Sequence, residues 1–354
     1  MDYTVALDKI REALSPDQAA IIYTNENRRY LTGFPSSLGY LLIANKAQKL
    51  LVDGRYFEAA CKKVSSVPVE LLTKLSEQLC EFANQNGVKN ILLEDEVSLS
   101  TAKTVENISG CKTESGKLSE LLTAFRSKKF DDELEYIRKA QKISEDAFVE
   151  LLEFIEPGMT EKRIATELKY RLLLCGADDM SFDPVVVSGE NSSLPHGVPT
   201  DKKVQKGDFI TFDFGALLCG YHSDMTRTVA IGECDAVQRK VYDTVLRAQC
   251  EAIESIYAGV RCCDVDAAAR NVINSNGYGE YFNHSTGHGV GIEIHEYPNL
   301  SARCSDELKP GYVVTAEPGI YLPGRFGVRI EDMIFVHENS IENITKFKKE
   351  LIIL

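Results

Sequence analysis

Several motifs that define common protein classes are missing from this chain of 354 residues. None of its ten cysteines forms a C-x-x-C pair, and the adjacent Cys262 and Cys263 suit neither a zinc ribbon nor a redox pair. No uncharged apolar run approaches the ~20 residues that cross a bilayer. Residues 1–16 lack the apolar core of a secretory signal, and phosphate-binding glycine loops are absent. We therefore expect a cytoplasmic protein with reduced thiols and no membrane partner.

The charge balance is acidic, with 53 acids against 40 lysines and arginines and a net charge of −13. An anionic surface repels phosphate backbones, so we do not expect a nucleic-acid partner. Some of the acids could be buried, because a carboxylate cluster that binds cations contributes to the same total. The hydrophobic fraction of 44% is ample for packed cores, and the length favours two domains.

The first part of the chain has the pattern of a small α/β domain. Short apolar runs alternate with helical patterns, which predicts an open mixed sheet covered by helices. The predicted strands are Ala19–Tyr23, Gly39–Ala44, Lys49–Val52, Val69–Leu72 and Asn90–Leu93. We place the boundary near residues 123–130, which gives domains 1–125 and 126–354.

The second part begins with two predicted helices. The acidic triplet 131–133 favours a helix start, Pro157-Gly158 ends that helix, and Thr160 caps the next one, which runs to about Cys175. The later predicted elements are strands 184–188, 208–214 and 221–231, helices 235–258 and 264–276, and strands 312–321 and 327–336. Two helices followed by a hairpin thus occur twice, which indicates two similar halves around a shared centre.

Each predicted hairpin carries a pair of carboxylates. If the first hairpin centres on the Leu218–Cys219 bond, Asp213 and Asp224 lie opposite each other. Glu317 and Glu331 are symmetric about a glycine and would be opposite in the second hairpin. Like charges across a ladder are destabilising unless a cation lies between them. Either pair alone could simply face water, but two pairs in otherwise apolar strands favour a cation site.

Histidines cluster between the two carboxylate pairs. His284, His288 and His295 lie within twelve residues of a glycine-rich stretch, and glycines permit close approach to a bound group. His196, in Leu-Pro-His-Gly, is a further candidate. A lone histidine in such a stretch is usually an ordinary polar residue, so it is the nearby carboxylates that favour ligation.

Together these motifs resemble the pita-bread metallopeptidases, which include prolidase, aminopeptidase P and, more distantly, methionine aminopeptidase. The motifs are S-G-x-N-S-x-x-P-H-G (188–197), D-F-G followed by S-D-M-T-R-T, G-H-G-x-G with a following I-H-E, T-x-E-P-G (315–319) and V-R-I-E-D (328–332). N-R-R-Y-L-T-G-F (27–34) and D-G-R-Y (53–56) resemble a creatinase-type N-terminal domain. The resemblance implies an α+β protein with a pita-bread catalytic domain and a smaller α/β domain before it.

The resemblance implies a dinuclear metal site whose ligands are Asp213, Asp224, His288, Glu317 and Glu331. Asp224 and Glu331 would bridge two divalent ions. Asp213 would bind one ion, and His288 with Glu317 would bind the other. One nitrogen among carboxylate oxygens suits Mn²⁺ and Co²⁺, and Zn²⁺ or Fe²⁺ also fit. Two such ions lower the pKa of a bridging water and supply a hydroxide nucleophile.

The same resemblance implies catalytic roles. Glu317 would carry the proton of the attacking water to the leaving nitrogen. His196 and His295 would donate hydrogen bonds to the developing oxyanion and to the substrate backbone. Arg329, two residues before Glu331, would orient a bridging carboxylate.

The expected substrate is a peptide with proline at the second position. An Xaa-Pro bond has no N–H, so an enzyme selects it with a shaped pocket rather than by bonding that group. His284 would line the pocket for the residue after the cut. Phe182 is a candidate wall residue, although a phenylalanine at such a position more often belongs to the core.

The sequence leaves some alternatives open. One alternative is a methionine-type aminopeptidase, but simple enzymes of that type lack the extra N-terminal domain. Another is a non-catalytic relative, but such proteins have usually lost metal ligands that this chain retains. A dipeptidase needs a base for the free carboxylate, and Arg325 and Arg55 are weak candidates for this role. Because the partner's N-terminal domain shapes the entrance in this family, the resemblance also implies a homodimer.

Overall fold

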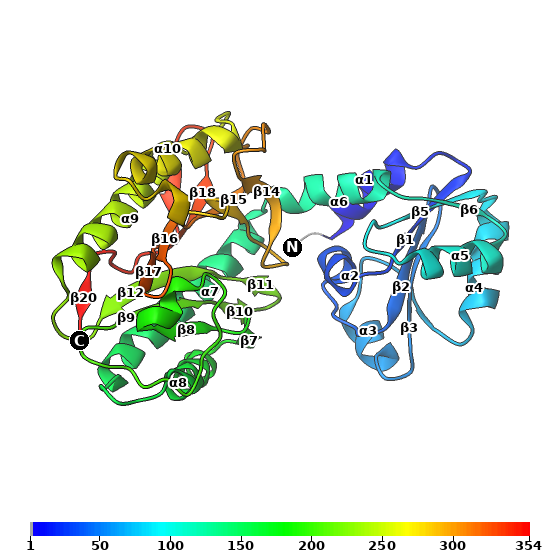
Figure 1. Ribbon diagram of the computed structural model, residues 1–354. Coiled ribbons are helices and arrows are strands. Elements are labelled where there is room, and N and C mark those ends of the chain that lie inside the picture. The colour runs from blue at the N-terminus through cyan, green and yellow to red at the C-terminus, as the bar shows by residue number, and fades with distance from the viewer. Residues whose placement is uncertain (1–2) are drawn as a thin grey trace. The chain divides into compact units, whose positions relative to one another are not determined.

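The computed structural model describes residues 3–354. The chain divides into two compact units, Met1–Arg126 and Ser127–Leu354, and both contain helices and sheets (Figure 1). Within the described range, no helix combines the length and the apolar character that crossing a bilayer requires.

The first unit is built on one mixed sheet in the order β4-β3-β2-β1-β5-β6. The pairs β1/β2 and β2/β3 are antiparallel, and the other pairs are parallel. Its strands are β1 (Gln18–Ile22), β2 (Gly39–Ala44), β3 (Gln48–Val52), β4 (Val69–Leu71), β5 (Asn90–Leu93) and β6 (Lys112–Glu114). The predicted open mixed sheet is thus confirmed. Strand β6 was not predicted, because its sequence, Lys-Thr-Glu, is polar and contains no apolar run.

Helices cover both faces of this sheet (Figure 1). They are α1 (Thr4–Ala13), α2 (Asn25–Thr32), α3 (Phe57–Lys63), α4 (Leu75–Asn86), α5 (Leu99–Ser109) and α6 (Lys117–Ser127). Leu79 and Phe82 of α4 pack in one core with Ile21, Leu42 and Leu51 of the central strands. Burial on both faces explains why these strands read as continuous apolar runs rather than as alternating patterns.

The second unit begins with α7 (Asp131–Phe154) and α8 (Glu161–Leu174), which start where the sequence predicts. Glu133 accepts a 2.8 Å hydrogen bond from the backbone N–H of Phe130 at the start of α7. The hydroxyl of Thr160 accepts from the backbone N–H of Arg163 at 3.2 Å. Each bond satisfies one of the free amide groups at a helix start.

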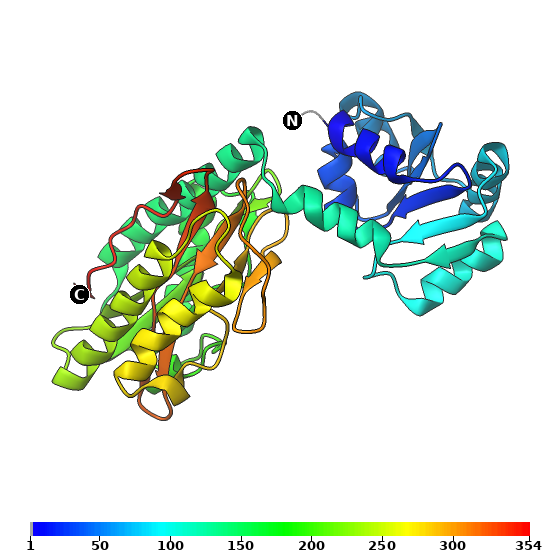
Figure 2. The same ribbon diagram turned by 90° about the horizontal axis from the view of Figure 1, so that it is seen from above.

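Two helix pairs lie on the outer sides of the central strands of this unit (Figure 2). The pair α7 and α8 packs on the sheet β20-β12-β9-β8, with Phe148, Phe212 and Phe214 in its core. The other pair, α9 (Ala236–Glu254) and α10 (Cys262–Ser275), packs on the strands that include Val314 and Ile334. Two helix-on-sheet halves therefore meet at a shared centre, as the sequence pattern predicts.

The strands of the second unit are short, and they are separated by turns. They are β7 (Asp179–Met180), β8 (Val185–Ser188), β9 (Phe209–Phe214), β10 (Ala216–Leu218), β11 (Tyr221–His222), β12 (Met225–Ala230), β13 (Gly287–Gly289), β14 (Glu296–Leu300), β15 (Val313–Ala316), β16 (Gly319–Leu322), β17 (Phe326–Arg329), β18 (Asp332–Val336), β19 (Ile341–Asn343) and β20 (Ile352–Ile353). Two short 3-10 helices, η1 (Gly189–Ser193) and η2 (Gly279–Tyr281), complete the unit.

The predicted register of the first hairpin is wrong by two residues. Asp213 lies opposite Thr226 rather than Asp224. The cause is the turn, which centres on Cys219-Gly220, both with positive φ, rather than one residue earlier. A shift of two leaves each side chain on the same face, so Asp213 and Asp224 still face the same side.

The second hairpin has the predicted register. Leu322 pairs with Phe326 across a three-residue turn in which Gly324 has a φ of 68°. The pairings Gly319 with Arg329 and Ala316 with Asp332 flank the two glutamates on either side. Residues 317 and 331 therefore occupy opposing positions where the two strands pass from one sheet to the next.

Candidate metal centre and active site

A cavity of about 550 Å³ lies in the second unit. Apart from the weak candidates Arg55 and Arg325, every residue that the sequence analysis predicts for the site lines it: Phe182, His196, Asp213, Asp224, His284, His288, His295, Glu317, Arg329 and Glu331. These side chains come from both helix-on-sheet halves and from the loops between their strands. The fold therefore brings together residues that are more than 140 positions apart in sequence.

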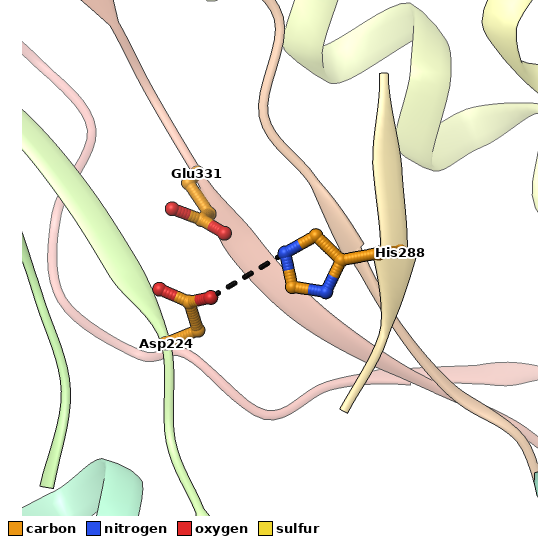
Figure 3. Close-up of side chains that lie close together, drawn as sticks. All are labelled: Asp224, His288 and Glu331. Carbon is orange, nitrogen blue, oxygen red and sulfur yellow. Dashed lines mark ion pairs between the residues drawn. The ribbon is translucent and has the colours of Figure 1, made fainter. Parts of the chain in front are cut away.

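Asp224, His288 and Glu331, which all line this cavity, lie close together (Figure 3). One ligand atom from each lies within 4.8 Å of the other two. The Nε2 atom of His288 lies 3.6 Å from Oδ2 of Asp224 and 3.3 Å from Oε1 of Glu317. Two carboxylates and one imidazole thus lie close enough to share a small cation, and the carboxylate of Glu317 lies beside the imidazole.

The unsatisfied atoms of the cavity fit bound cations. Oδ1 of Asp213, Oδ1 of Asp224 and Oε1 of Glu331 are buried and have no hydrogen-bond partner within residues 3–354. An unpaired buried carboxylate oxygen costs free energy unless a cation or a donor compensates it. The second oxygens of two of these carboxylates are held by the protein, since Thr226 donates to Oε2 of Glu331 at 2.7 Å and Arg329 donates to Oδ2 of Asp213.

Burial and mutual repulsion shift the protonation equilibria of these carboxylates. Burial raises the pKa of Asp224 well above its usual range, and the charges of Glu331 and Asp213 add to the effect. Burial likewise raises the pKa of Glu331, with Glu317 and Asp213 adding to it. Burial raises the pKa of Glu317 to about 7, although Arg329 opposes the shift. Such clustering of perturbed carboxylates is typical of functional sites.

Arg329 connects the metal-facing carboxylates to the wall of the cavity. Its Nη2 donates to Oδ2 of Asp213 at 2.5 Å, and its Nη1 donates to the hydroxyl of Tyr321 at 2.6 Å. Its Nε donates to the hydroxyl of Thr226 at 3.1 Å. The direct carboxylate partner of Arg329 is therefore Asp213. The predicted contact with a bridging carboxylate runs only through Thr226 to Glu331.

Carbonyl groups hold two of the histidines, His288 and His284, in defined tautomers. Nδ1 of His288 lies 3.0 Å from the carbonyl oxygen of Gly289, which can only accept, so Nε2 carries the free lone pair toward the carboxylates. Burial lowers the pKa of His288, which keeps it neutral and able to bind a metal. The ring of His295 packs edge-on against His288, with ring centroids 4.4 Å apart.

His284 is also part of the cavity lining. Nδ1 of His284 lies 2.8 Å from the carbonyl oxygen of Ser285, and its Nε2 accepts from the hydroxyl of Tyr321 at 2.9 Å. Burial lowers the pKa of His284 to about 4. Tyr321 therefore joins the neutral His284 to Arg329, because its hydroxyl donates to one and accepts from the other.

Two residues of this network, Tyr321 and Thr226, are not anticipated by the sequence analysis. Alternate residues of a strand share one face. Tyr321 is four residues after Glu317, and Thr226 is two residues after Asp224, so that rule provides a signal for both. Neither residue type is a metal ligand, which is why a search for ligands passes over them.

Comparison with protein families identifies the fold. Residues 135–338 match the model of metallopeptidase family M24, and residues 7–128 match the creatinase/prolidase N-terminal domain. The chain belongs to metallopeptidase family M24. This family assignment implies divalent metal binding, in agreement with the unpaired carboxylate oxygens of the cavity.

Individual members of the family align along almost the entire chain. A Xaa-Pro dipeptidase from Pyrococcus horikoshii is 38% identical over 94% of both chains. The solved structure of a Xaa-Pro dipeptidase from Bacillus anthracis is 37% identical, covers 100% of both chains and has a TM-score of 0.96. That of an X-Pro aminopeptidase from Thermotoga maritima is 36% identical over 98% of this chain and 100% of the other, with a TM-score of 0.91. The pita-bread fold and the N-terminal α/β domain expected from the motifs are thereby confirmed.

Proposed function

We propose that this chain is an exopeptidase that hydrolyses the bond between a first residue and proline, with residues 126–354 as its catalytic domain. The observation that carries the proposal is the set of unpaired carboxylate oxygens on Asp213, Asp224 and Glu331, buried in a cavity that also holds four histidines. Two divalent ions, with Mn²⁺ favoured by one nitrogen among oxygen ligands, would be held there by these residues with His288 and Glu317.

Different side chains of the cavity would take different roles in hydrolysis. When bound, such ions supply an activated water and polarise the scissile carbonyl. Glu317, whose pKa is raised to about 7, is suited to accept a proton and to deliver it to the leaving nitrogen. His196 and His295 line the cavity, from which they would donate to the developing oxyanion and to the substrate backbone.

Specificity for proline would come from the wall of the cavity that His284 and Phe182 form. Arg329 is the only arginine or lysine in the described lining, and its nitrogens are engaged by Asp213, Tyr321 and Thr226. Arg325 stacks on Phe326 outside this lining. His196 and His295, with the hydroxyl of Ser285 and the amide of Asn299, are therefore the remaining side-chain donors with which the lining could bind the free carboxylate of a dipeptide.

The setting of the enzyme is part of the proposal. All ten cysteines are free thiols, which fits a reducing compartment such as the cytoplasm. We propose a homodimer, in line with the family resemblance, and light scattering of the purified chain tests it. A monomer with full activity would contradict the view that a partner completes the entrance.

The test compares Ala-Pro, Ala-Pro-Ala and Met-Ala-Ala as substrates for metal-stripped protein, with and without Mn²⁺. Mn²⁺-dependent release of alanine from one or both proline peptides, with Met-Ala-Ala intact, is the expected result. Cleavage of Ala-Pro alone defines a dipeptidase, and cleavage of Ala-Pro-Ala alone defines an aminopeptidase. Cleavage of Met-Ala-Ala alone would replace the proposal with a methionine-type specificity. Metal binding without any cleavage would overturn the assignment as a peptidase of either kind.

A further inference from the structure

We propose that Glu161 positions His196 by holding together the two ends of the loop that carries it. The inference rests on the role proposed above for His196. Glu161 is the first residue of α8, its relative exposure is 0%, and it is not among the residues that line the cavity. It would therefore act through the loop and not on the substrate.

The carboxylate of Glu161 bonds to the start, the middle and the end of residues 188–200. Oε1 accepts from the N–H and the hydroxyl of Ser188 at 2.6 and 2.8 Å. Oε2 accepts from the N–H and the hydroxyl of Thr200 at 2.9 and 2.6 Å. The amide nitrogen of Asn191 lies 3.1 Å from both oxygens. One side chain thus closes a loop that contains no regular structure except η1.

These hydrogen bonds are of a strong kind. Each joins a neutral N–H or O–H donor to a carboxylate oxygen, and hydrogen bonds to charged acceptors are roughly twice as strong as neutral ones. The backbone N–H of Glu161 also donates to the carbonyl of Lys202 at 3.0 Å, which continues the attachment past the end of the loop. The first turn of a helix is in addition a favourable place for a negative charge.

His196 depends on this loop for its orientation. The residue is exposed, and its ring makes no hydrogen bond to any other residue between 3 and 354. The middle of the loop is attached to the cavity wall, since Arg329 donates to the carbonyl of Pro195 at 3.2 Å and Gly327 donates to the hydroxyl of Ser192 at 2.9 Å. Glu161 fixes the two ends. With both attachments in place, the loop backbone sets the direction of the imidazole.

The substitution Glu161→Gln tests this role. It replaces one acceptor oxygen with an NH₂ group that would face N–H and O–H donors. Because a displacement of ~1 Å can cost ~10²-fold in rate, we expect kcat to fall by about 10-fold or more. The bound Mn²⁺ should remain at the parent level. In the His196→Ala background, the same substitution should change kcat by less than about 2-fold, because residues that act as a unit are not additive.

Glu94→Gln is the matched control. Glu94 is a buried carboxylate of the first unit with the same kinds of donor: the backbone N–H groups of Tyr23 and Thr24, the hydroxyl of Thr24 and the amide of Asn27. Its substitution should lower the melting temperature and leave kcat at the parent value. A rate loss that merely follows lost stability would appear in both variants.

The outcomes separate the two proposals. Equal losses of kcat from Glu161→Gln in the parent and in His196→Ala would overturn the positioning role and leave His196 in place. A parent-level kcat in the single variant His196→Ala would overturn both the role proposed for His196 and the positioning role of Glu161. If Glu161→Gln does not fold, Thr200→Val replaces it, since this change removes one donor to Oε2. It should lower kcat by about 3-fold or more in the parent only, and an unchanged kcat in the parent would overturn the positioning role.

Discussion

Arg329 donates from Nη2 to Oδ2 of Asp213 at 2.5 Å, while Oδ1 of the same carboxylate has no partner among the described residues. One oxygen is therefore fixed by the protein and the other is directed into the cavity. This division explains how a buried, always-charged guanidinium can lie beside a cation site. It balances part of the negative charge in the absence of metal and orients the ligand in its presence.

Arg329→Met should destabilise the metal-free protein more than the metal-loaded protein. Without the guanidinium, Asp213, whose side chain is 18% exposed, is left as a partly buried charge without its partner, a change that costs at most about 3–5 kcal/mol of unfolding free energy. Bound Mn²⁺ would restore part of the lost attraction. Urea denaturation with and without Mn²⁺ measures both values. Arg325→Met, on the exposed turn of the same hairpin, is the control. Equal losses in both metal states would contradict the compensating role.

Glu331→Ala should abolish turnover and weaken metal binding. Glu331 is 1% exposed, and it presents one oxygen to Thr226 and the other to the cavity. Its loss should lower metal affinity by more than the ~10–100-fold typical of losing a supporting group around a metal site. Metal content after dialysis and cleavage of Ala-Pro-containing peptides measure the two effects. Glu338→Ala, an exposed glutamate seven residues later, should behave as the parent. Full activity of Glu331→Ala at trace metal would contradict the dinuclear site.

The two hairpins show what the sequence can predict about this fold. In the second hairpin, Gly324 occupies a position with positive φ, so the residue type marks the turn and fixes the register. In the first hairpin, Cys219 also has positive φ, but this conformation is uncommon for cysteine, so the residue type does not indicate the turn. The register prediction there is wrong by two residues, and it preserved the correct face only because side chains alternate with period two.

The residues around the site also differ in how far the sequence alone could predict them. Carboxylates in apolar strands and histidines in a glycine-rich stretch are visible in the sequence, so the carboxylates and histidines expected at the site could be predicted. Tyr321 and Thr226 could have been found by alternation along their strands. Glu161 could not, because its partners Ser188 and Thr200 are 27 and 39 residues away and meet it only after folding. Nothing at the start of a helix distinguishes it from any other favourable first-turn acid.

Stabilisation by Mn²⁺ should increase as the pH rises. In the metal-free protein, the raised pKa values of Asp224, Glu331 and Glu317 mean that the folded state binds protons more tightly than the unfolded state. Metal-free stability therefore falls as the pH rises from about 4.5 toward 7, the range set by Glu317. Bound metal competes with these protons. Melting temperatures with Mn²⁺ and with EDTA from pH 5 to 8 should diverge with increasing pH, and a constant difference would contradict this linkage.

A second pH effect should come from Glu133, outside the cavity. This side chain is 2% exposed and accepts hydrogen bonds from the N–H of Phe130 and the hydroxyl of Tyr221. Burial raises its pKa from 4.5 to about 7, which Lys129 opposes in part. Because the folded pKa lies above the unfolded one, the stability that protonated Glu133 contributes is complete below pH 4.5 and is lost as the pH rises toward 7.

Glu133→Gln should therefore stabilise the protein at pH 8 relative to the parent, by an amount on the order of 3 kcal/mol at most. The amide retains an acceptor for the N–H of Phe130, and its NH₂ group can donate to the hydroxyl of Tyr221. The difference in unfolding free energy between variant and parent should shrink as the pH falls from 7 to 5. Titration of the metal-site carboxylates cancels in that difference, because variant and parent share those residues. Glu135→Gln, on the exposed side of the same helix, provides the matched control and should give a difference that does not vary with pH. A pH-independent effect of Glu133→Gln would mean that this carboxyl is ionised in the folded protein throughout the range.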